Sequence, residues 1–419
     1  MTAQLKLAPT STYKALTPQT VTGWLEAQPT IAAILGGKAA EWQAREVGDG
    51  NLNLVFIVEG PKGSVVAKQA LPYVRLVGES WPLPLARAHY EYYALTEQQA
   101  WAPAYVPKTY LHDHDMALTV MEYLTPHIIL RKGLVQGKRY PKAAAHLGSF
   151  LARTLFHTSD YFLTPVQKRE KVAQYLTNTA MCKISEDLIF DEPYYAAPLN
   201  RNTPELDDVA AALRADTALK LAVQQLKAGF MNKTEALLHG DLHTGSVMVT
   251  EDDTRAIDPE FAFFGPMGFD IGAILANFFM AAFAQEGLET SKGERAAQAA
   301  WILEQIEVIW NTFSAEFTAL WNQRSSTGEL FNARIATPEL QAEALANVLK
   351  GIEQDALGYA GCKIIRRIVG LAHVEDFEAI ADTTRRASAE RKAIAFARRL
   401  ILERSNIGSV SNAVKAAQT

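Results

Sequence analysis

The chain has 419 residues, and its 48% hydrophobic composition provides enough apolar material for more than one core. The formal net charge of -5 excludes the strong positive field with which proteins attract nucleic acid or anionic membranes. Two cysteines are too few for a disulfide framework, and prolines interrupt the N-terminal segment before any signal-peptide core can form. These features favour a cytoplasmic protein of two lobes with a small-molecule ligand.

The first third of the sequence mixes helical and β-type patterns. Residues 18–36 predict one helix that ends at a glycine pair, and residues 85–100 predict a second. Residues 41–70 hold three runs of β-prone side chains that are separated by glycine turns. With two further strands at 105–111 and 117–123, the prediction is a five-stranded antiparallel sheet.

The rest of the sequence is mostly helical by its hydrophobic spacing. Helices are predicted at 142–157, 209–225, 268–284, 293–321 and 384–404, with a β-type interruption at 246–257. The most apolar of these segments is shorter than the roughly 20 residues that cross a bilayer, so we expect a buried helix. The predicted fold class is α+β, with a β-rich lobe at 1–124 and a helical lobe at 125–419.

Two short motifs with acidic residues are the most informative about chemistry. Residues 237–246 read LLHGDLHTGS, and residues 256–260 read AIDPE. Phosphoryl transfer requires one carboxylate that positions the attacking hydroxyl and other carboxylates that hold magnesium against the phosphates of the nucleotide. Asp241 suits the first role, and Asp258 and Glu260 suit the second.

The order of these motifs resembles the protein-kinase-like fold in its aminoglycoside and choline kinase branch. HGDLHTGS together with DPE is similar to the 5-methylthioribose kinase family. Further segments that look familial are residues 48–53, 65–75, 121–124 and 361–373. The resemblance implies a bilobal fold, ATP and Mg2+ as cofactors, and a homodimer. It also implies phosphorylation of 5-methylthioribose at its 1-hydroxyl in methionine salvage.

The resemblance also assigns an ATP site. Its predicted residues are Asn51, Lys68, Glu122, Tyr123, Leu124, Asp258, Pro259 and Glu260. A lysine in an apolar strand needs a carboxylate or phosphate partner, which supports the assignment of Lys68. Glu91, on the following helix, is expected to orient that lysine. The segment 77–82 around Trp81 is either a mobile lid or a packed loop.

On the acceptor side, we expect Asp241 and one of the adjacent arginines Arg366 and Arg367 to contact substrate. Their side chains diverge by about 100° on a helix, so they cannot share one ligand equally.

Asp270 is assigned a structural role beside the catalytic loop. His239 and His243 fit a polar network better than a zinc site. Ser246 replaces the asparagine that binds a second magnesium ion in most relatives. The prediction of one bound metal ion is therefore better supported than a prediction of two.

Two alternatives remain open at this point. A kinase of the same fold that acts on an aminoglycoside, choline or homoserine would carry much the same phosphate machinery. A catalytically silent nucleotide-binding scaffold would retain the fold without turnover. The residues Thr244-Gly245-Ser246 and Asp258-Pro259-Glu260 argue against the first alternative. The presence of Lys68, Asp241 and Asp258 argues against the second.

Overall fold

The computed structural model divides into two compact units, each described here by itself. The described residues are 12–48, 52–74, 78–324, 328–332 and 334–418. Unit 1 contains the described residues up to Pro126 together with Asn178–Met181 and Ile257–Ala262, and unit 2 contains the remainder. The Asp258-Pro259-Glu260 segment therefore packs with the N-terminal part of the chain, although it lies far along the sequence.

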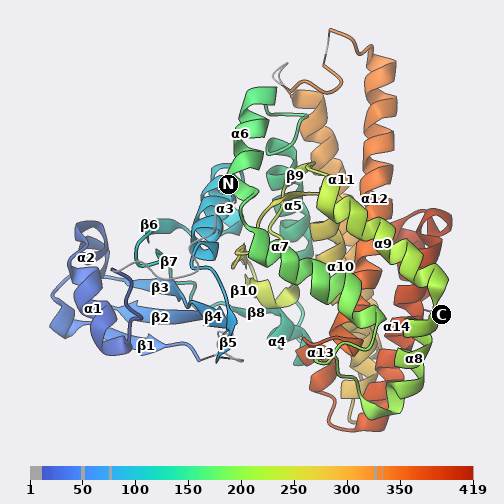
Figure 1. Ribbon diagram of the computed structural model, residues 1–419, viewed down its shortest axis with the longest axis horizontal. Helices are drawn as coiled ribbons and strands as arrows, with labels where there is room; N and C mark the ends of the chain where they lie inside the picture. The colour runs from blue at the N-terminus through green and yellow to red at the C-terminus, as the bar shows by residue number, and fades with distance from the viewer. Residues whose placement is uncertain (1–11, 49–51, 75–77, 325–327, 333, 419) are drawn as a thin grey trace. The chain divides into compact units, whose positions relative to one another are not determined.

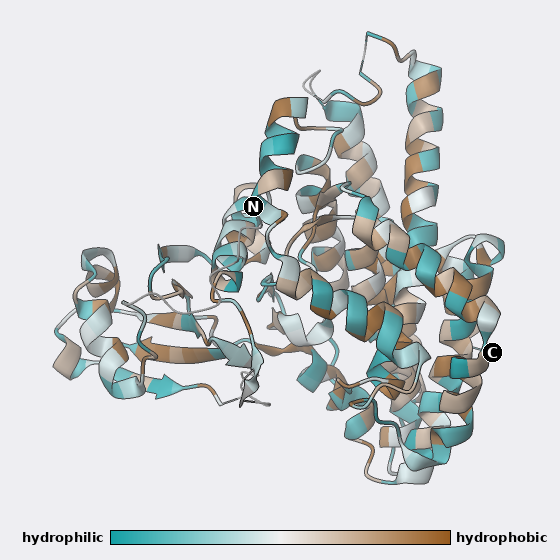
Figure 2. Ribbon diagram, in the orientation of Figure 1, coloured by the Kyte–Doolittle hydropathy of each residue, from teal (hydrophilic) through white to brown (hydrophobic). Residues whose placement is uncertain are grey.

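Unit 1 is built on a five-stranded antiparallel sheet in the order β1-β2-β3-β7-β6 (Figure 1). The strands are β1 Gln43–Glu46, β2 Asn53–Glu59, β3 Ser64–Ala70, β6 Thr109–Asp113 and β7 Leu118–Glu122. Figure 2 shows the central strands β2 and β3 as largely hydrophobic and the edge strand β1 as hydrophilic. The five strands predicted from the sequence are thus present, in an antiparallel sheet.

Successive side chains along a strand point to opposite faces of the sheet, so their order determines which residues lie on each face. Phe56, Val65 and Leu118 point to one face, where they form a core with α1 Pro18–Glu26 and α2 Pro29–Leu35. Lys68 follows Ala67 of that core and so points to the opposite face, toward α3 Arg87–Trp101. One face is therefore structural, and the other is available for chemistry.

Three details of unit 1 differ from the prediction. The single helix predicted at 18–36 is two helices, because Pro29 starts α2 and the preceding Gln28 is extended. Strand β6 starts at Thr109 rather than at 105, because Pro103–Tyr105 forms a 3-10 turn. A short hairpin of β4 Tyr73–Val74 and β5 Gly78–Pro82, which was not predicted, includes Trp81. Residues 75–77 lie outside the described residues.

Unit 2 is mainly helical. Its helices are α4 Leu130–Val135, α5 Ala143–His157, α6 Pro165–Tyr175, α8 Asp207–Ala215, α9 Thr217–Asn232, α10 Met267–Leu288, α11 Ala296–Gln323, α12 Pro338–Val369, α13 Glu375–Glu378, α14 Thr383–Ile407 and α15 Val410–Ala417. Helix α7 Thr179–Ser185 starts among the unit 1 residues and continues in unit 2. Short strands β8 Ile128–Ile129, β10 Val247–Val249 and β11 Thr254–Ala256 form one small sheet, and β9 Ala236–Leu237 pairs with β12 Phe264–Gly265.

The β-type interruption at 246–257 is confirmed as the hairpin of β10 and β11. The helix predicted at 209–225 is wrong in one respect, because Asp216 breaks it into α8 and α9. Asp216 is extended, and its side chain accepts a hydrogen bond from the Leu219 N–H as the N-cap of α9.

Helix α10 is the central helix of unit 2. By length and composition alone it could cross a membrane, but 94% of its most apolar window is buried inside the protein. Its burial on all sides accounts for that composition, as expected for a core helix. Glycines allow α12 to approach it closely: a Cβ atom at Gly272 would lie 2.5 Å from the Ala356 carbonyl oxygen. This close contact fixes the start of α10 against the part of α12 that precedes Lys363.

Candidate active site

Lys68 lies between two carboxylates in unit 1. Its Nζ atom is 2.7 Å from Glu91 Oε1 and also forms a short ion pair with Asp258. The Lys68 and Glu91 side chains are almost fully buried, whereas the Asp258 side chain is 42% exposed. Burial disfavours the charged lysine, but the nearby carboxylates, led by Asp258, outweigh it and raise the pKa of Lys68. The ammonium group is therefore held in its charged form.

Arg87 and Glu260 form a second, deeper layer of this cluster. Arg87 lies four residues before Glu91 on α3, so both side chains leave the same face of the helix. Its guanidinium is 3.3 Å from Glu260 Oε2 and donates to the carbonyls of Leu52 and Leu71. Asn53 donates to Glu260 Oε2 at 3.2 Å and accepts from Arg87 at 3.1 Å. The network holds the 257–262 segment against the sheet.

The cluster carries more negative than positive charge. Asp258, Glu260 and Glu91 supply three carboxylates against Lys68 and Arg87. Burial, reinforced by the neighbouring carboxylates and opposed by Lys68, raises the pKa of Glu91 to about 7. Burial and the Asp258 charge also raise the pKa of Glu260. Hard oxygen donors with an excess of negative charge fit a magnesium ion.

Asp258 has an unusual backbone conformation, with a φ of 70°. Left-handed backbone is uncommon for residues other than glycine, and in well-defined structures it concentrates at functional sites. Here it directs the Asp258 carboxylate to Lys68, while the following Pro259 and Glu260 are buried. The amide of Asn178 donates to the carbonyls of Glu260 and Ala262, which fixes the segment after the motif.

The predicted ATP-site residues Glu122, Tyr123 and Leu124 lie at and directly after the end of β7. The Glu122 N–H donates to the Lys108 carbonyl, and its carboxylate accepts from the Lys108 N–H. Tyr123 accepts a hydrogen bond from Arg45 through its hydroxyl, and Leu124 is buried. The Glu122 N–H is therefore already occupied within the sheet. The predicted residue Asn51 lies outside the described residues.

Asp241 lies in unit 2, in the loop that follows β9. Gly240, with a φ of 85°, makes the turn before it. Asp270, at the start of α10, accepts hydrogen bonds from the N–H groups of His239 at 2.6 Å and Gly240 at 3.0 Å. Burial raises the pKa of Asp270, against these hydrogen bonds. The loop is thus anchored through its backbone by a buried carboxylate.

The Asp241 carboxylate contacts a lysine and a histidine. Oδ1 is 3.1 Å from Lys363 Nζ, and Oδ2 is 3.3 Å from His243 Nε2. Burial opposes ionisation, but Lys363, His243 and Arg367 hold the pKa of Asp241 well below its usual range. Asp241 is therefore ionised in the physiological pH range, and both of its carboxylate oxygens can accept hydrogen bonds.

Lys363 and the two predicted arginines leave adjacent turns of α12. Burial, opposed by Asp241 and reinforced by the charges of the two arginines, lowers the pKa of Lys363 to about 8. Arg366 is only 8% exposed, and its Nε has no hydrogen-bond partner within the part of the chain that the structure describes. Arg367 donates weakly to the Ala372 carbonyl at 3.5 Å, and burial and Arg366 lower its pKa to about 9. Such a buried excess of positive charge is suited to an anionic ligand.

Residues 43–325 match a family model described as the phosphotransferase enzyme family. A solved ethanolamine kinase of Plasmodium vivax is 12% identical with a TM-score of 0.43, over 93% of this chain and 97% of its own. Methylthioribose kinase 1 of Oryza sativa subsp. japonica is 45% identical, over 97% of this chain and 96% of its own. Methylthioribose kinase of Escherichia coli O45:K1 is 43% identical, over 97% and 98%. The chain belongs to the methylthioribose kinase family.

As a member of the methylthioribose kinase family, the protein is an ATP-dependent phosphotransferase with the α+β fold predicted from its sequence. The Ser246 hydroxyl lies 3.3 Å from His243 Nδ1. His243 in turn contacts Asp241, and burial lowers the pKa of His243 to about 4. Ser246 thus contacts a neutral histidine beside the Asp241 carboxylate.

Several residues of the two clusters were not predicted. Arg87, Asn53 and Lys363 each contact a predicted carboxylate. In addition, Arg131 of α4 lies 3.2 Å from the buried carboxylate of Asp376. Lys363 lies within a segment that looks familial, so its buried charge on an apolar helix was a usable signal. Asn53 likewise ends the familial segment 48–53, whereas Arg87 and Arg131 lie in segments with no such motif.

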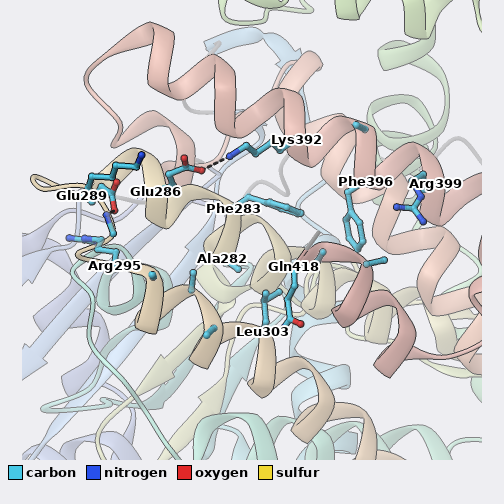
Figure 3. A pocket seen from close by; sticks show the side chains of 18 residues that line it. Ala282, Phe283, Glu286, Glu289, Arg295, Leu303, Lys392, Phe396, Arg399 and Gln418 are labelled. Carbon is cyan, nitrogen blue, oxygen red and sulfur yellow. Dashed lines mark hydrogen bonds and ion pairs between the residues drawn. The ribbon is translucent and has the colours of Figure 1, made fainter.

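A cavity of about 870 Å³ lies elsewhere in unit 2 (Figure 3). Ala282 and Glu286 line it, at the end of α10 opposite to Asp270. Phe283, Leu303 and Phe396 provide apolar walls, and none of the predicted site residues takes part. This cavity is therefore separate from the Asp241 cluster.

Proposed function

We propose that this protein transfers the γ-phosphate of ATP to the 1-hydroxyl of 5-methylthioribose, which yields 5-methylthioribose 1-phosphate in methionine salvage. The observation that carries the proposal is the full-length similarity to methylthioribose kinases, together with an ionised Asp241 held between Lys363 and His243. A sugar hydroxyl is a neutral nucleophile that needs a fixed acceptor for its proton, and Asp241 supplies one.

The unit 1 cluster serves the nucleotide. Lys68 contacts the α- and β-phosphates, and Glu91 keeps its ammonium group in place. Asp258 and Glu260 hold Mg2+, which when bound neutralises charge on the phosphates. Asn51, Glu122, Tyr123, Leu124 and Pro259 complete the proposed ATP site. When the nucleotide binds, the Lys68 ammonium group must move away from Asp258 far enough to contact phosphate oxygens.

The unit 2 cluster serves the acceptor and the transferred phosphate. Asp241 has a low pKa, so its main contribution is to orient the hydroxyl, and the proton moves late, as the oxygen bonds to phosphorus. Arg366, with its unpaired buried Nε, donates to phosphate or substrate oxygens. Arg367 supports it through its charge. Asp270 acts through the loop backbone as a positioning residue.

Two broader expectations belong to the same proposal. We expect a homodimer, on the resemblance to the family, and sedimentation velocity of the purified protein measures the assembly directly. We also expect a cytoplasmic location, which is consistent with free thiols at Cys182 and Cys362 in the structure.

The proposal is tested by an ADP-release assay with Mg2+ and ATP that compares 5-methylthioribose, ribose, choline, homoserine and kanamycin as acceptors. The expected result is turnover with 5-methylthioribose and a phosphorus NMR signal of an anomeric phosphate. Preferred turnover with another acceptor would discard the substrate assignment and retain the phosphotransferase. Absence of turnover with all five acceptors would favour a silent nucleotide-binding protein.

A further inference from the structure

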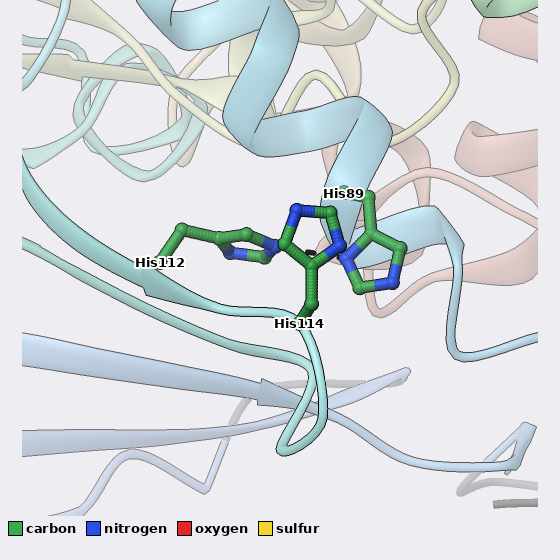
Figure 4. Close-up of side chains that lie close together, drawn as sticks. All are labelled: His89, His112 and His114. Atoms are coloured by element: carbon green, nitrogen blue, oxygen red, sulfur yellow. Dashed lines mark hydrogen bonds between the residues drawn. The ribbon is translucent and has the colours of Figure 1, made fainter. Parts of the chain in front are cut away.

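Three histidines of unit 1 lie together outside the nucleotide cluster. They are His89 of α3, His112 of β6 and His114 of the turn after β6. One ring nitrogen or another from each of the three lies within 4.8 Å of the others, and Figure 4 shows the rings gathered at one point. His89 lies well before His112 and His114 in the sequence, so no short motif marks the three as a set.

We propose that His89, His112 and His114 form a binding site for a divalent transition-metal ion of the Zn2+ class. Three imidazoles with one open position are a common ligand set for this ion. Tetrahedral coordination with Zn–N bonds of about 2.0–2.1 Å requires ligand nitrogens roughly 3.4 Å apart. His89 Nδ1 and His112 Nε2 are 2.8 Å apart, and the three ligand nitrogens lie within 4.8 Å of one another, so side-chain rotations are needed to bring the set to that spacing.

The surroundings of the rings support a ligand role. The other nitrogen of His112, Nδ1, lies 2.9 Å from the hydroxyl of buried Thr119, which orients the ring as an outer partner of a metal ligand does. His114 Nε2 lies 3.1 Å from the Tyr93 hydroxyl. His114 is exposed, so water can reach the site and complete the coordination.

An ion at this site would act on α3. His89 lies two residues from both Arg87 and Glu91, and side chains two apart on a helix diverge by about 200°. His89 therefore leaves α3 on the side opposite to the residues that hold Glu260 and Lys68. The ion would tie that opposite side of the helix to β6 and the following turn. The simplest competing explanation is a hydrogen bond between two neutral rings, which binds no metal.

The test is an optical titration of the full-length protein with Co2+ in excess Mg2+, which keeps the carboxylate site filled. The proposal predicts intense visible absorption of four-coordinate Co2+ at one equivalent and its loss on addition of one equivalent of Zn2+. Because His114 is exposed, His114→Ala should fold normally and weaken binding by at least about tenfold. His89→Gln should behave in the same way, whereas the control His146→Gln in unit 2 should bind like wild type.

A second readout separates binding from folding. Zn2+ should raise the thermal midpoint of the wild-type protein and of His146→Gln, and leave that of His114→Ala unchanged. Absence of the absorption band in wild type would overturn the proposal, as would an undiminished band in both His114→Ala and His89→Gln.

Discussion

At the scale of single residues, the two clusters differ in the sign of their surplus charge. In unit 1, three carboxylates surround Lys68 and Arg87, and in unit 2, Asp241 is outnumbered by Lys363, Arg366 and Arg367. A surplus of carboxylates suits a metal ion that accompanies the nucleotide phosphates. A surplus of buried cations suits the oxygens of the transferred phosphate.

The depressed pKa of Lys363 predicts a pH limit on activity. Its ammonium is charged at pH 7 and loses its proton as the pH rises through about 8, whereas an ordinary lysine retains it to above pH 10. The loss removes the cation beside Asp241, so kcat/KM for the sugar should fall above pH 8. In Lys363→Arg, the fall should move upward by about one pH unit or more, because arginine does not titrate in this range. If kcat/KM falls at the same high pH in the wild type and in Lys363→Arg, a group other than Lys363 causes the fall.

Arg87 should matter chiefly for stability. Arg87→Met would leave the buried carboxylate of Glu260 without its cation, which costs about 3–5 kcal/mol. Urea unfolding measures the loss, and Glu260→Gln combined with Arg87→Met should recover part of it, because the uncompensated charge is then removed. A double variant no more stable than Arg87→Met would contradict the pairing.

The candidate residues could be read from sequence only where a motif marks them. Asp241, Asp258 and Glu260 stand in short motifs whose order carries chemical meaning. Arg87 and Asn53 reach Glu260 across more than 170 positions of sequence, and only the folded chain brings them together. The occupied N–H of Glu122 likewise depends on its pairing with Lys108, which no local pattern indicates.

At the scale of elements, the spacing of hydrophobic residues predicted whether a segment is a helix or a strand better than it predicted where the segment begins and ends. The five sheet strands and the apolar helix α10 have clear periods or clear apolar runs. The predicted helices at 18–36 and 209–225 each contain a break, because Pro29 and Asp216 start new helices inside them. Only the part of α12 around Arg366 and Arg367 was expected to be helical. The extent of α12 was not predicted, since its first half is partly exposed and its second half is buried on nearly all sides, so no constant apolar stripe runs along it.

The contact between α10 and α12 gives a prediction at this scale. Gly272→Ala would place a Cβ 2.5 Å from the Ala356 carbonyl, so the helices must separate at a cost of about 1–3 kcal/mol. The same movement displaces Lys363 from Asp241, so kcat should fall along with the unfolding midpoint.

Gly351→Ala on α12 is the matched control. A Cβ there has no neighbour within 4 Å, so the substitution should stabilise the helix by about 0.5–1 kcal/mol and leave kcat unchanged. Equal effects of the two substitutions in urea unfolding and kinetics would contradict the role of close helix contact.

At the scale of the whole molecule, the two clusters belong to different compact units. Substitutions in them should therefore separate nucleotide binding from turnover. Asp258→Asn removes a negative charge from the proposed magnesium site and should weaken Mg2+-dependent ATP binding by at least about tenfold, since a ligand of the ion is lost. Calorimetric titration with ATP in the presence and absence of Mg2+ measures this loss. Unchanged Mg2+-dependent affinity would remove Asp258 from the metal site.

The central claim is that Asp241 orients the hydroxyl of 5-methylthioribose for attack on ATP. The most direct measurement compares kcat for 5-methylthioribose and the dissociation constant of Mg2+-ATP in the wild type and in Asp241→Asn. The account predicts that kcat falls by about 10²–10⁴-fold while the affinity for Mg2+-ATP stays nearly unchanged. A variant that keeps wild-type kcat, or one whose only defect is weak nucleotide binding, would contradict it.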